Sequence, residues 1–256
     1  MAVRPWLAYE AGMTNLTASA IVCAVRPHGE HGAIVRALTA EAGLLGGYVQ
    51  GGRSSRLRPV LIPGNIVRAA FRSRTPDQLA SLSVELAESR GPLLGEPLPA
   101  AAIDWACALT AAALPEGHPY PAVFSALSAV LDAVEAAPAA RGWAVALVRY
   151  ELLLLAELGF GLDLSECAAT GTQAHLAFVS PRTGRAVSLE GAAGHEHKLL
   201  PLPAFLAEGG EAGWEDILAG LALTGRFVEQ SLLTDRRADV LAARDRLVQR
   251  LKRAVA

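Results

Sequence analysis

The chain has 256 residues, of which 52% are hydrophobic and 19% are charged. That composition excludes a wholly disordered chain, and the length suggests one or two domains. The net charge of −2 conceals an asymmetry: residues 1–75 carry nine arginines and three acidic residues, a net +6, whereas residues 76–256 carry 14 basic and 22 acidic residues, a net −8. Such a division suggests a basic module for a polyanion joined to a body with another task.

The sequence indicates a soluble cytoplasmic protein. Three cysteines leave at least one unpaired, which favours a reducing compartment. Residues 1–19 lack the apolar core of a signal peptide, because Trp6, Tyr9 and Glu10 interrupt it. The most apolar stretches, residues 98–114 and 145–158, are broken by charges and are too short to cross a membrane.

The first part of the chain is predicted to form short β-strands. Turn signals such as Pro27-His28-Gly29 separate them, and the adjacent Gly46 and Gly47 suggest a bulge or bend. Five short strands at this spacing suit a small closed barrel, which leaves no exposed sheet edge. We expect this domain over residues 1–88, with strands at 20–26, 32–39, 44–50, 65–73 and 79–88.

Residues 89–256 are predicted to form a second, mainly helical domain. Pro92, Pro97 and Pro99 mark a linker before the first helix, and Gly159 with Phe160 behind it predicts a Schellman-type helix end. An irregular, glycine-rich insert over 163–199 contains a hairpin at 178–185. Helices are expected at 100–114, from Pro121 to Pro138, at 142–158, and at 235–255, where Val240, Leu241, Leu247, Val248 and Leu251 form the buried stripe.

A glycine- and serine-rich loop carries three arginines, Arg53, Arg56 and Arg58, between two predicted strands. This stretch contains no acidic partner, and burying an unpaired arginine is costly, so we expect these side chains to contact phosphates. Tyr48 and His28 offer rings for stacking on bases, although Tyr48 is equally compatible with a place in the core. The further arginines expected beside the loop are Arg26, Arg36 and Arg68.

The insert raises the question of a metal. A structural zinc site needs two close pairs of Cys or His ligands. His195 and His197 supply one pair, but Cys167 is followed by Thr170 where a second thiol would stand. Three candidate ligands do not complete a tetrahedron, so we predict no metal and no other cofactor. The common hydrolase and nucleotide-binding motifs are also absent from the sequence, which argues against an enzyme. The alternative hypothesis is a metal-dependent hydrolase that uses Cys167, His195 and His197.

Two sets of motifs resemble one known family. The first runs from Arg26-Pro27-His28-Gly29-Glu30 through Thr39 and Gly43 to Gly51-Gly52-Arg53-Ser54-Ser55-Arg56. The second runs from Arg149-Tyr150-Glu151 through Leu158-Gly159-Phe160-Gly161-Leu162-Asp163-Leu164 to Cys167-Ala168-Ala169-Thr170-Gly171. Their order and spacing are similar to those of the RecO family of DNA repair proteins, over about residues 17–250.

This resemblance implies an α+β fold: an N-terminal OB-fold barrel and a mainly α-helical domain with a zinc-ribbon-like insert. It also implies a recombination mediator that binds single- and double-stranded DNA, anneals strands, binds the acidic tail of the single-strand DNA-binding protein, and acts with RecR to load RecA. Ser54 lies within the loop motif, and Gln50 stands where many members have a lysine. Thr170 and the missing thiols after Gly184 make the zinc site degenerate.

For the acidic tail we expect an apolar groove between helices, with Arg149 or Arg141 meeting the terminal carboxylate. The apolar candidates are equally compatible with a plain core; they are Phe124, Leu127, Leu131 and Leu152. A barrel module that binds RNA instead of DNA is the remaining alternative.

Overall fold

A computed structural model describes residues 14–75, 78–136, 140–234 and 238–255. The chain forms two compact units. The barrel unit comprises the residues up to Pro92 together with Pro115–Pro121, and the helical unit comprises Leu93–Leu114 and the residues from Ala122 onward. The loop between the first two helices therefore belongs to the barrel unit: the backbone N–H of Gly117 donates to the carbonyl of Leu44 at 3.0 Å.

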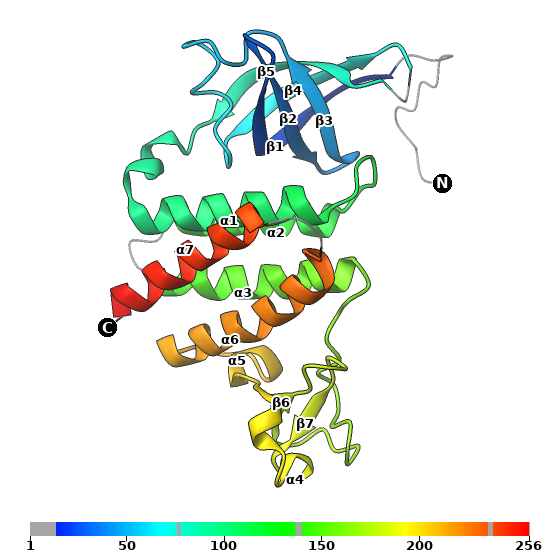
Figure 1. Ribbon diagram of the computed structural model, residues 1–256, viewed down its shortest axis with the longest axis vertical. Helices are drawn as coiled ribbons and strands as arrows, with labels where there is room; N and C mark the ends of the chain where they lie inside the picture. The colour runs from blue at the N-terminus through cyan, green and yellow to red at the C-terminus, as the bar shows by residue number, and fades with distance from the viewer. Residues whose placement is uncertain (1–13, 76–77, 137–139, 235–237, 256) are drawn as a thin grey trace. The chain divides into compact units, whose positions relative to one another are not determined.

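Five strands form the closed barrel that the sequence predicts (Figure 1). They are β1 (Thr14–His28), β2 (Gly32–Thr39), β3 (Gly43–Val49), β4 (Ile66–Ser73) and β5 (Ala80–Glu88). The order around the barrel is β1-β2-β3-β5-β4, and the β3–β5 pairing is parallel. The first half of β1 pairs with β4 and its second half pairs with β2, so this long strand links its two neighbours in the closed barrel.

The glycine pair in β3 does not form the bulge that the sequence suggested. β2 and β3 pair without a register shift, and the shifts lie instead at Val22/Ala24 in β1 and at Ile66/Val67 in β4. Gly47 has a packing role, since a Cβ there would lie 2.6 Å from the Cβ of Leu82 on β5. The missing side chain allows β5 to approach β3 and close the barrel.

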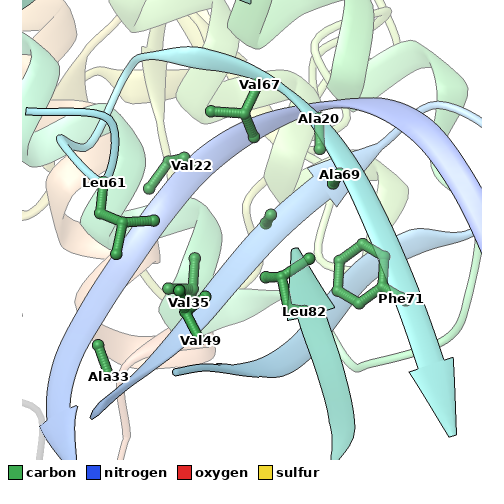
Figure 2. Close-up of a cluster of buried hydrophobic side chains, with 11 residues drawn as sticks. Ala20, Val22, Ala33, Val35, Val49, Leu61, Val67, Ala69, Phe71 and Leu82 are labelled. Carbon is green, nitrogen blue, oxygen red and sulfur yellow. The ribbon is translucent and has the colours of Figure 1, made fainter. Parts of the chain in front are cut away.

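Alternating side chains from the strands fill the barrel (Figure 2). In that view Ala33 and Leu61 lie at one side of the cluster, and Phe71 and Leu82 lie at the other. Most of the side chains that fill the barrel are alanine or valine, and such small residues suit the narrow interior of a five-stranded barrel. The buried members are Ala20, Val22, Ala33, Val35, Ala37, Val49, Leu61, Val67, Ala69, Phe71 and Leu82.

Among the described residues, the helical unit contains the four predicted helices, one further long helix and several short ones. Its main helices are α1 (Pro97–Ala113), α2 (Pro121–Ala136), α3 (Ala140–Glu157), α6 (Trp214–Phe227) and α7 (Ala238–Val255). Pro97 and Pro99 lie in the first turn of α1 rather than in a linker, because a helix needs no N–H donors there. The expected end of α2 at Pro138 lies outside the described residues.

The end of α3 has the predicted Schellman geometry. Gly159 has φ +85°, its N–H donates to Ala156, and the N–H of Phe160 donates to Leu155 at 2.8 Å. Helix α6 has no counterpart among the helices expected from the sequence, and a short π-helical turn, η3 (Val228–Leu232), continues it. In α7 the fully buried stripe is Ala243, Leu247 and Leu251, whereas Val240, Leu241 and Val248 are half-buried.

The insert contains the expected hairpin within a three-stranded sheet. β6 (Leu176–Val179) pairs with β7 (Ala186–Ser188) on one side and with β8 (Leu200–Pro201) on the other. The short helices α4 (Leu189–Ala192), η2 (Glu196–Lys198) and α5 (Ala204–Ala207) flank the strands. Throughout the described ranges, no helix is both long and apolar enough to cross a membrane.

Candidate nucleic-acid interface

The arginine-bearing loop between β3 and β4 is anchored by its apolar residues. Leu57 and Val60 pack against the barrel core, and Leu61 is part of it. The side-chain amide of Asn65 donates to the carbonyls of Pro59 at 2.9 Å and Val60 at 3.1 Å. With its inner side held in this way, the loop presents its arginines to solvent.

Arg53 joins this loop to the β1–β2 turn. Its guanidinium Nη1 donates to the carbonyl oxygens of Glu30 at 3.0 Å and Gly29 at 3.3 Å, and its backbone N–H donates to His31. The preceding glycine, Gly52, allows this approach, because a Cβ there would lie 2.8 Å from the Cβ of Ala33. Arg53 therefore positions the loop as well as adding charge to it.

Arg56 and Arg58 are exposed, and neither side chain has a hydrogen bond or an ion pair within the described part of the chain. A hollow of about 460 Å³ opens beside Arg58. Its lining combines two arginines with apolar residues, a composition that suits a phosphate with its attached sugar. The lining residues are Val25, Pro27, Ala33, Gly52, Arg53, Arg58 and Leu61.

Tyr48 lies on the outer surface of β3 and not in the barrel core. Its half-buried ring covers Gly32, where a Cβ would come within 2.3 Å of the ring. His28 meets Tyr48 edge to face, with the ring centroids 5.9 Å apart. The two aromatic residues are therefore together on one face, as stacking on bases would need. Arg26 is exposed near this end of β1.

Two of the expected arginines differ from the loop arginines in their surroundings. Arg36 is half-buried, and its Nε lies 3.1 Å from Oε1 of Glu116, so an acidic partner neutralises it. Arg68 points outward from β4 opposite Glu85 of β5 in the strand register. Neither Arg36 nor Arg68 is among the residues that line the hollow beside the loop.

Gln50 and Ser54 lie at the base of the loop. Gln50 is exposed where β3 ends. Ser54 uses its side chain within the loop, since its Oγ accepts the backbone N–H of Leu57 at 3.3 Å. Ser54 therefore shapes the turn that carries Arg56.

Sequence reasoning missed two residues that hold this region. Asn65 is fully buried, and its Oδ1 accepts the backbone N–H of Arg90 at 2.8 Å. The Arg90 side chain is 1% exposed and donates to the carbonyl of Gly64 at 2.8 Å. A single polar residue at a strand start and an arginine at a domain boundary carry no distinctive signal, so the sequence alone did not reveal this clamp.

The insert does not bring together a set of metal ligands. Within the described residues no group of three or more His, Cys, Asp and Glu side chains is close enough to hold a metal ion. Cys167 is buried, whereas His195 and His197 are exposed. No observation therefore favours the metal-dependent hydrolase.

Four residues of the insert surround the position where the resemblance would place a zinc ion. Cys167-x-x-Thr170 is followed after the hairpin by Ser188-x-x-Gly191, and these four positions converge. The Cys167 Sγ accepts the N–H of Ser188 at 3.2 Å and its hydroxyl at 3.3 Å, and a Cβ on Gly191 would lie 2.8 Å from that sulfur. One thiol, two hydroxyls and a glycine do not fit zinc, which needs four ligands of Cys, His or carboxylate type.

The residues expected to bind an acidic tail are only partly accessible. Leu127 and Leu131 of α2 are 0% exposed and belong to the core, because they face inward at three- and four-residue steps with Val123 and Val134. Their burial contradicts a place in an accessible groove. Phe124 is half-buried.

The other three candidates share one face of α3. Arg141, Arg149 and Leu152 are separated by eight and three residues, a spacing that aligns side chains along a helix. Both arginines are exposed and Leu152 is half-buried. A hollow of about 710 Å³ at the start of α1 and α3 is lined by Glu96 and Glu135, whose charge is unsuited to an acidic peptide.

Comparisons with known proteins cover both units. The family model described as "Recombination protein O N terminal" matches residues 13–90, and "Recombination protein O C terminal" matches residues 97–238.

Curated relatives extend over nearly the whole chain. The "DNA repair protein RecO" of Rhodospirillum centenum is 47% identical over 241 residues, covering 93% of this chain and 95% of the relative. That of Rhodospirillum rubrum is 47% identical and covers 91% and 94%, and that of Caulobacter vibrioides strain NA1000 is 43% identical and covers 92% and 96%. The closed barrel, the helical unit and these matches agree: the chain belongs to the RecO family of DNA repair proteins.

Proposed function

We propose that this protein is a non-catalytic, cytoplasmic recombination mediator that binds single- and double-stranded DNA through its barrel unit. It anneals complementary strands and, with RecR, helps to load RecA onto DNA coated by the single-strand DNA-binding protein. The observation that carries the proposal is the anchored loop with Arg56 and Arg58 free of protein partners in the described structure, in a chain of the RecO family.

The binding step follows from electrostatics. Exposed guanidinium groups neutralise phosphates and release counterions, so the affinity for a single strand falls by about 0.7 log units per log unit of salt for each phosphate contacted. The edge-to-face pair of Tyr48 and His28 adds a sequence-tolerant stacking surface beside the loop. Strands whose charge is screened in this way can pair without ATP.

The test compares Arg56→Ala/Arg58→Ala with the wild type by anisotropy of a fluorescent single-stranded oligonucleotide at several salt concentrations. Loss of two phosphate contacts should lower the salt slope by about 1.4. Arg53 is left intact because its bonds to the β1–β2 turn would confound the result.

The matched control is Arg182→Ala/Arg253→Ala, which removes the same charge from exposed positions in the helical unit. The control should retain the wild-type slope. A loop variant with the wild-type affinity and slope would exclude the loop as the DNA site. Tighter binding of single-stranded RNA than DNA at the same salt would favour the RNA-binding alternative.

We also place the acidic tail of the single-strand DNA-binding protein on the α3 face of Arg141, Arg149 and Leu152. Two exposed cations beside a half-buried leucine supply a carboxylate contact and an apolar contact. Leu127 and Leu131 have no part in this site because they are buried.

A further inference from the structure

The barrel has a second basic hollow that the loop arginines do not reach. Its volume is about 340 Å³, and it opens where β1 begins, β4 ends and β5 begins. Asn15, Arg72 and Ser81 lie side by side across these three strands in register. Arg74 and Gln78 complete the polar wall; the remaining lining residues are Ser73 and Leu79.

The chemistry of this second hollow is that of a phosphate site. Two guanidinium groups, two side-chain amides and the Ser81 hydroxyl can all donate hydrogen bonds, and no lining residue is acidic. Neither Arg72 nor Arg74 has an ion pair or a side-chain hydrogen bond among the described residues. The exposed Leu79, 47% accessible, adds an apolar contact for a sugar or base.

Among the described residues, no acidic side chain lines this hollow. On the outer face of β5, Ser81 is followed by Ser83 and then by Glu85, which stands opposite Arg68. At about 3.3 Å per residue, Glu85 is about 13 Å along the strand from Ser81. Asp77 lies outside the described residues.

The two hollows are on different sides of the barrel. The loop hollow includes Val25 of β1, whereas the second hollow includes Asn15, ten residues earlier on the same strand. Followed along β1, which has a register shift between these residues, the spacing is a path of about 33 Å. Figure 2 shows the same separation in the core: Ala33 and Leu61 line the loop hollow, and at the opposite side Phe71 and Leu82 are the chain neighbours of Arg72 and Ser81.

We infer that the hollow formed by Asn15, Arg72, Arg74, Gln78 and Ser81 binds the backbone of a second nucleic-acid strand while the loop arginines hold the first. The inference rests on the proposed DNA-binding function and supplies what annealing needs, namely two strands on one protein. The two hollows share no lining residue, so a short strand bound at one hollow leaves the side chains of the other free.

The experiment is calorimetric titration with a non-complementary single-stranded oligonucleotide of about four nucleotides, the short end of the range that one OB-fold occupies. Low salt strengthens the binding. The wild type should bind two oligonucleotides per chain, whereas Arg72→Ala/Arg74→Ala should bind one. The loop variant Arg56→Ala/Arg58→Ala should also bind one, and the two pairs combined should bind none. Arg182→Ala/Arg253→Ala is the charge-matched control and should still bind two.

Annealing of longer complementary strands provides the second readout. Arg72→Ala/Arg74→Ala should lose the protein-dependent annealing rate while still binding one strand. A wild type that binds one short oligonucleotide per chain, or an Arg72→Ala/Arg74→Ala variant that still binds two, would overturn the second site. A wild type that binds none would instead refute the proposed DNA-binding function itself, so the two failures are distinguishable.

Discussion

At the scale of single residues, the arginines of the barrel unit divide by what they contact. Arg90 is buried and closes a loop, Arg53 ties a loop to a turn, and Arg36 faces Glu116. Arg56 and Arg72 contact no described acidic group. Only arginines of this last kind can give their full charge to a phosphate. A count of arginines in the sequence therefore overestimates the number that can bind DNA.

Cys167 offers a test at this scale. Burial raises the pKa of its thiol, but hydrogen bonds from Ser188, Thr170 and the backbone outweigh burial and lower the pKa to about 6. Ser188→Ala should raise that pKa because it removes the hydroxyl donor at 3.3 Å. The measurement is thiolate absorbance against pH, taken as a difference from Cys167→Ala.

The pKa of Cys167 also predicts how the stability of the protein depends on pH. A thiol whose pKa is lower in the folded than in the unfolded protein stabilises the fold at high pH, and this contribution is lost as pH falls through about 6. Ser165→Ala is the control, because that hydroxyl contacts Asp163 instead. An absorbance transition that is the same in Ser188→Ala and the wild type would contradict the assignment.

At the scale of elements, a buried polar cluster joins four helices of the helical unit. Glu151 of α3 is 0% exposed and accepts hydrogen bonds from Trp105 of α1 at 2.6 Å, from Thr224 of α6, and from Arg244 of α7 at 3.1 Å. Helices α1, α6 and α7 thus each supply one donor to the single carboxylate on α3. Such a cluster fixes which helix faces meet, because any other packing would leave a buried charge unpaired.

Glu151→Leu should therefore destabilise the protein strongly, by about 3–5 kcal/mol, since it removes the carboxylate from Arg244, whose side chain is only 12% exposed, and from the buried donors Trp105 and Thr224. Asp104→Asn is the comparison, because the pair of Asp104 with Arg246 is exposed and should contribute about 1 kcal/mol or less. Urea unfolding followed by circular dichroism gives both free energies. Equal losses in the two variants would show that burial does not decide the value of these ion pairs.

At the scale of the whole molecule, the proposed sites lie in two units of opposite net charge. The basic barrel unit carries the proposed DNA sites, and the proposed tail site lies on α3 of the helical unit. Because the sites are in separate units, a change at one should leave direct binding at the other intact.

Arg149→Glu should weaken binding of a peptide with the acidic tail sequence by about tenfold or more, since it puts a repulsive charge where a carboxylate is expected. Calorimetry measures that affinity, and the oligonucleotide titration on the same variant should match the wild type. Undiminished peptide affinity would remove Arg149 from the site. Weaker DNA binding as well would show that the units do not act separately.

The strands and most helices were predictable because each has a strong local signal. Alternation and turn residues placed β2 and β4, and Gly159 marked the end of α3. Helix α6 was not predictable, since Gly220, Thr224 and Gly225 lower its local propensity. Its neighbours explain these residues: a Cβ on Gly225 would lie 2.2 Å from Arg244, and one on Gly220 would lie 3.1 Å from Phe205.

In the candidate site, too, some features were predictable from local sequence and others were not. Local sequence identified the arginine loop, because three arginines lie close together in a glycine- and serine-rich segment that contains no acidic residue. It could not show that Glu116, 80 residues away, pairs with Arg36, or that Leu131 lies in the core.

By itself, then, the amino-acid sequence determined the barrel and the helical body, which depend on local patterns, and the family and the polarity of charge, which depend on the order of motifs and charges along the chain. Tertiary structure decided which arginines remain available, which residues surround Cys167, and where the second basic hollow forms. These features arise from contacts between residues far apart in the chain, and no local pattern encodes such contacts.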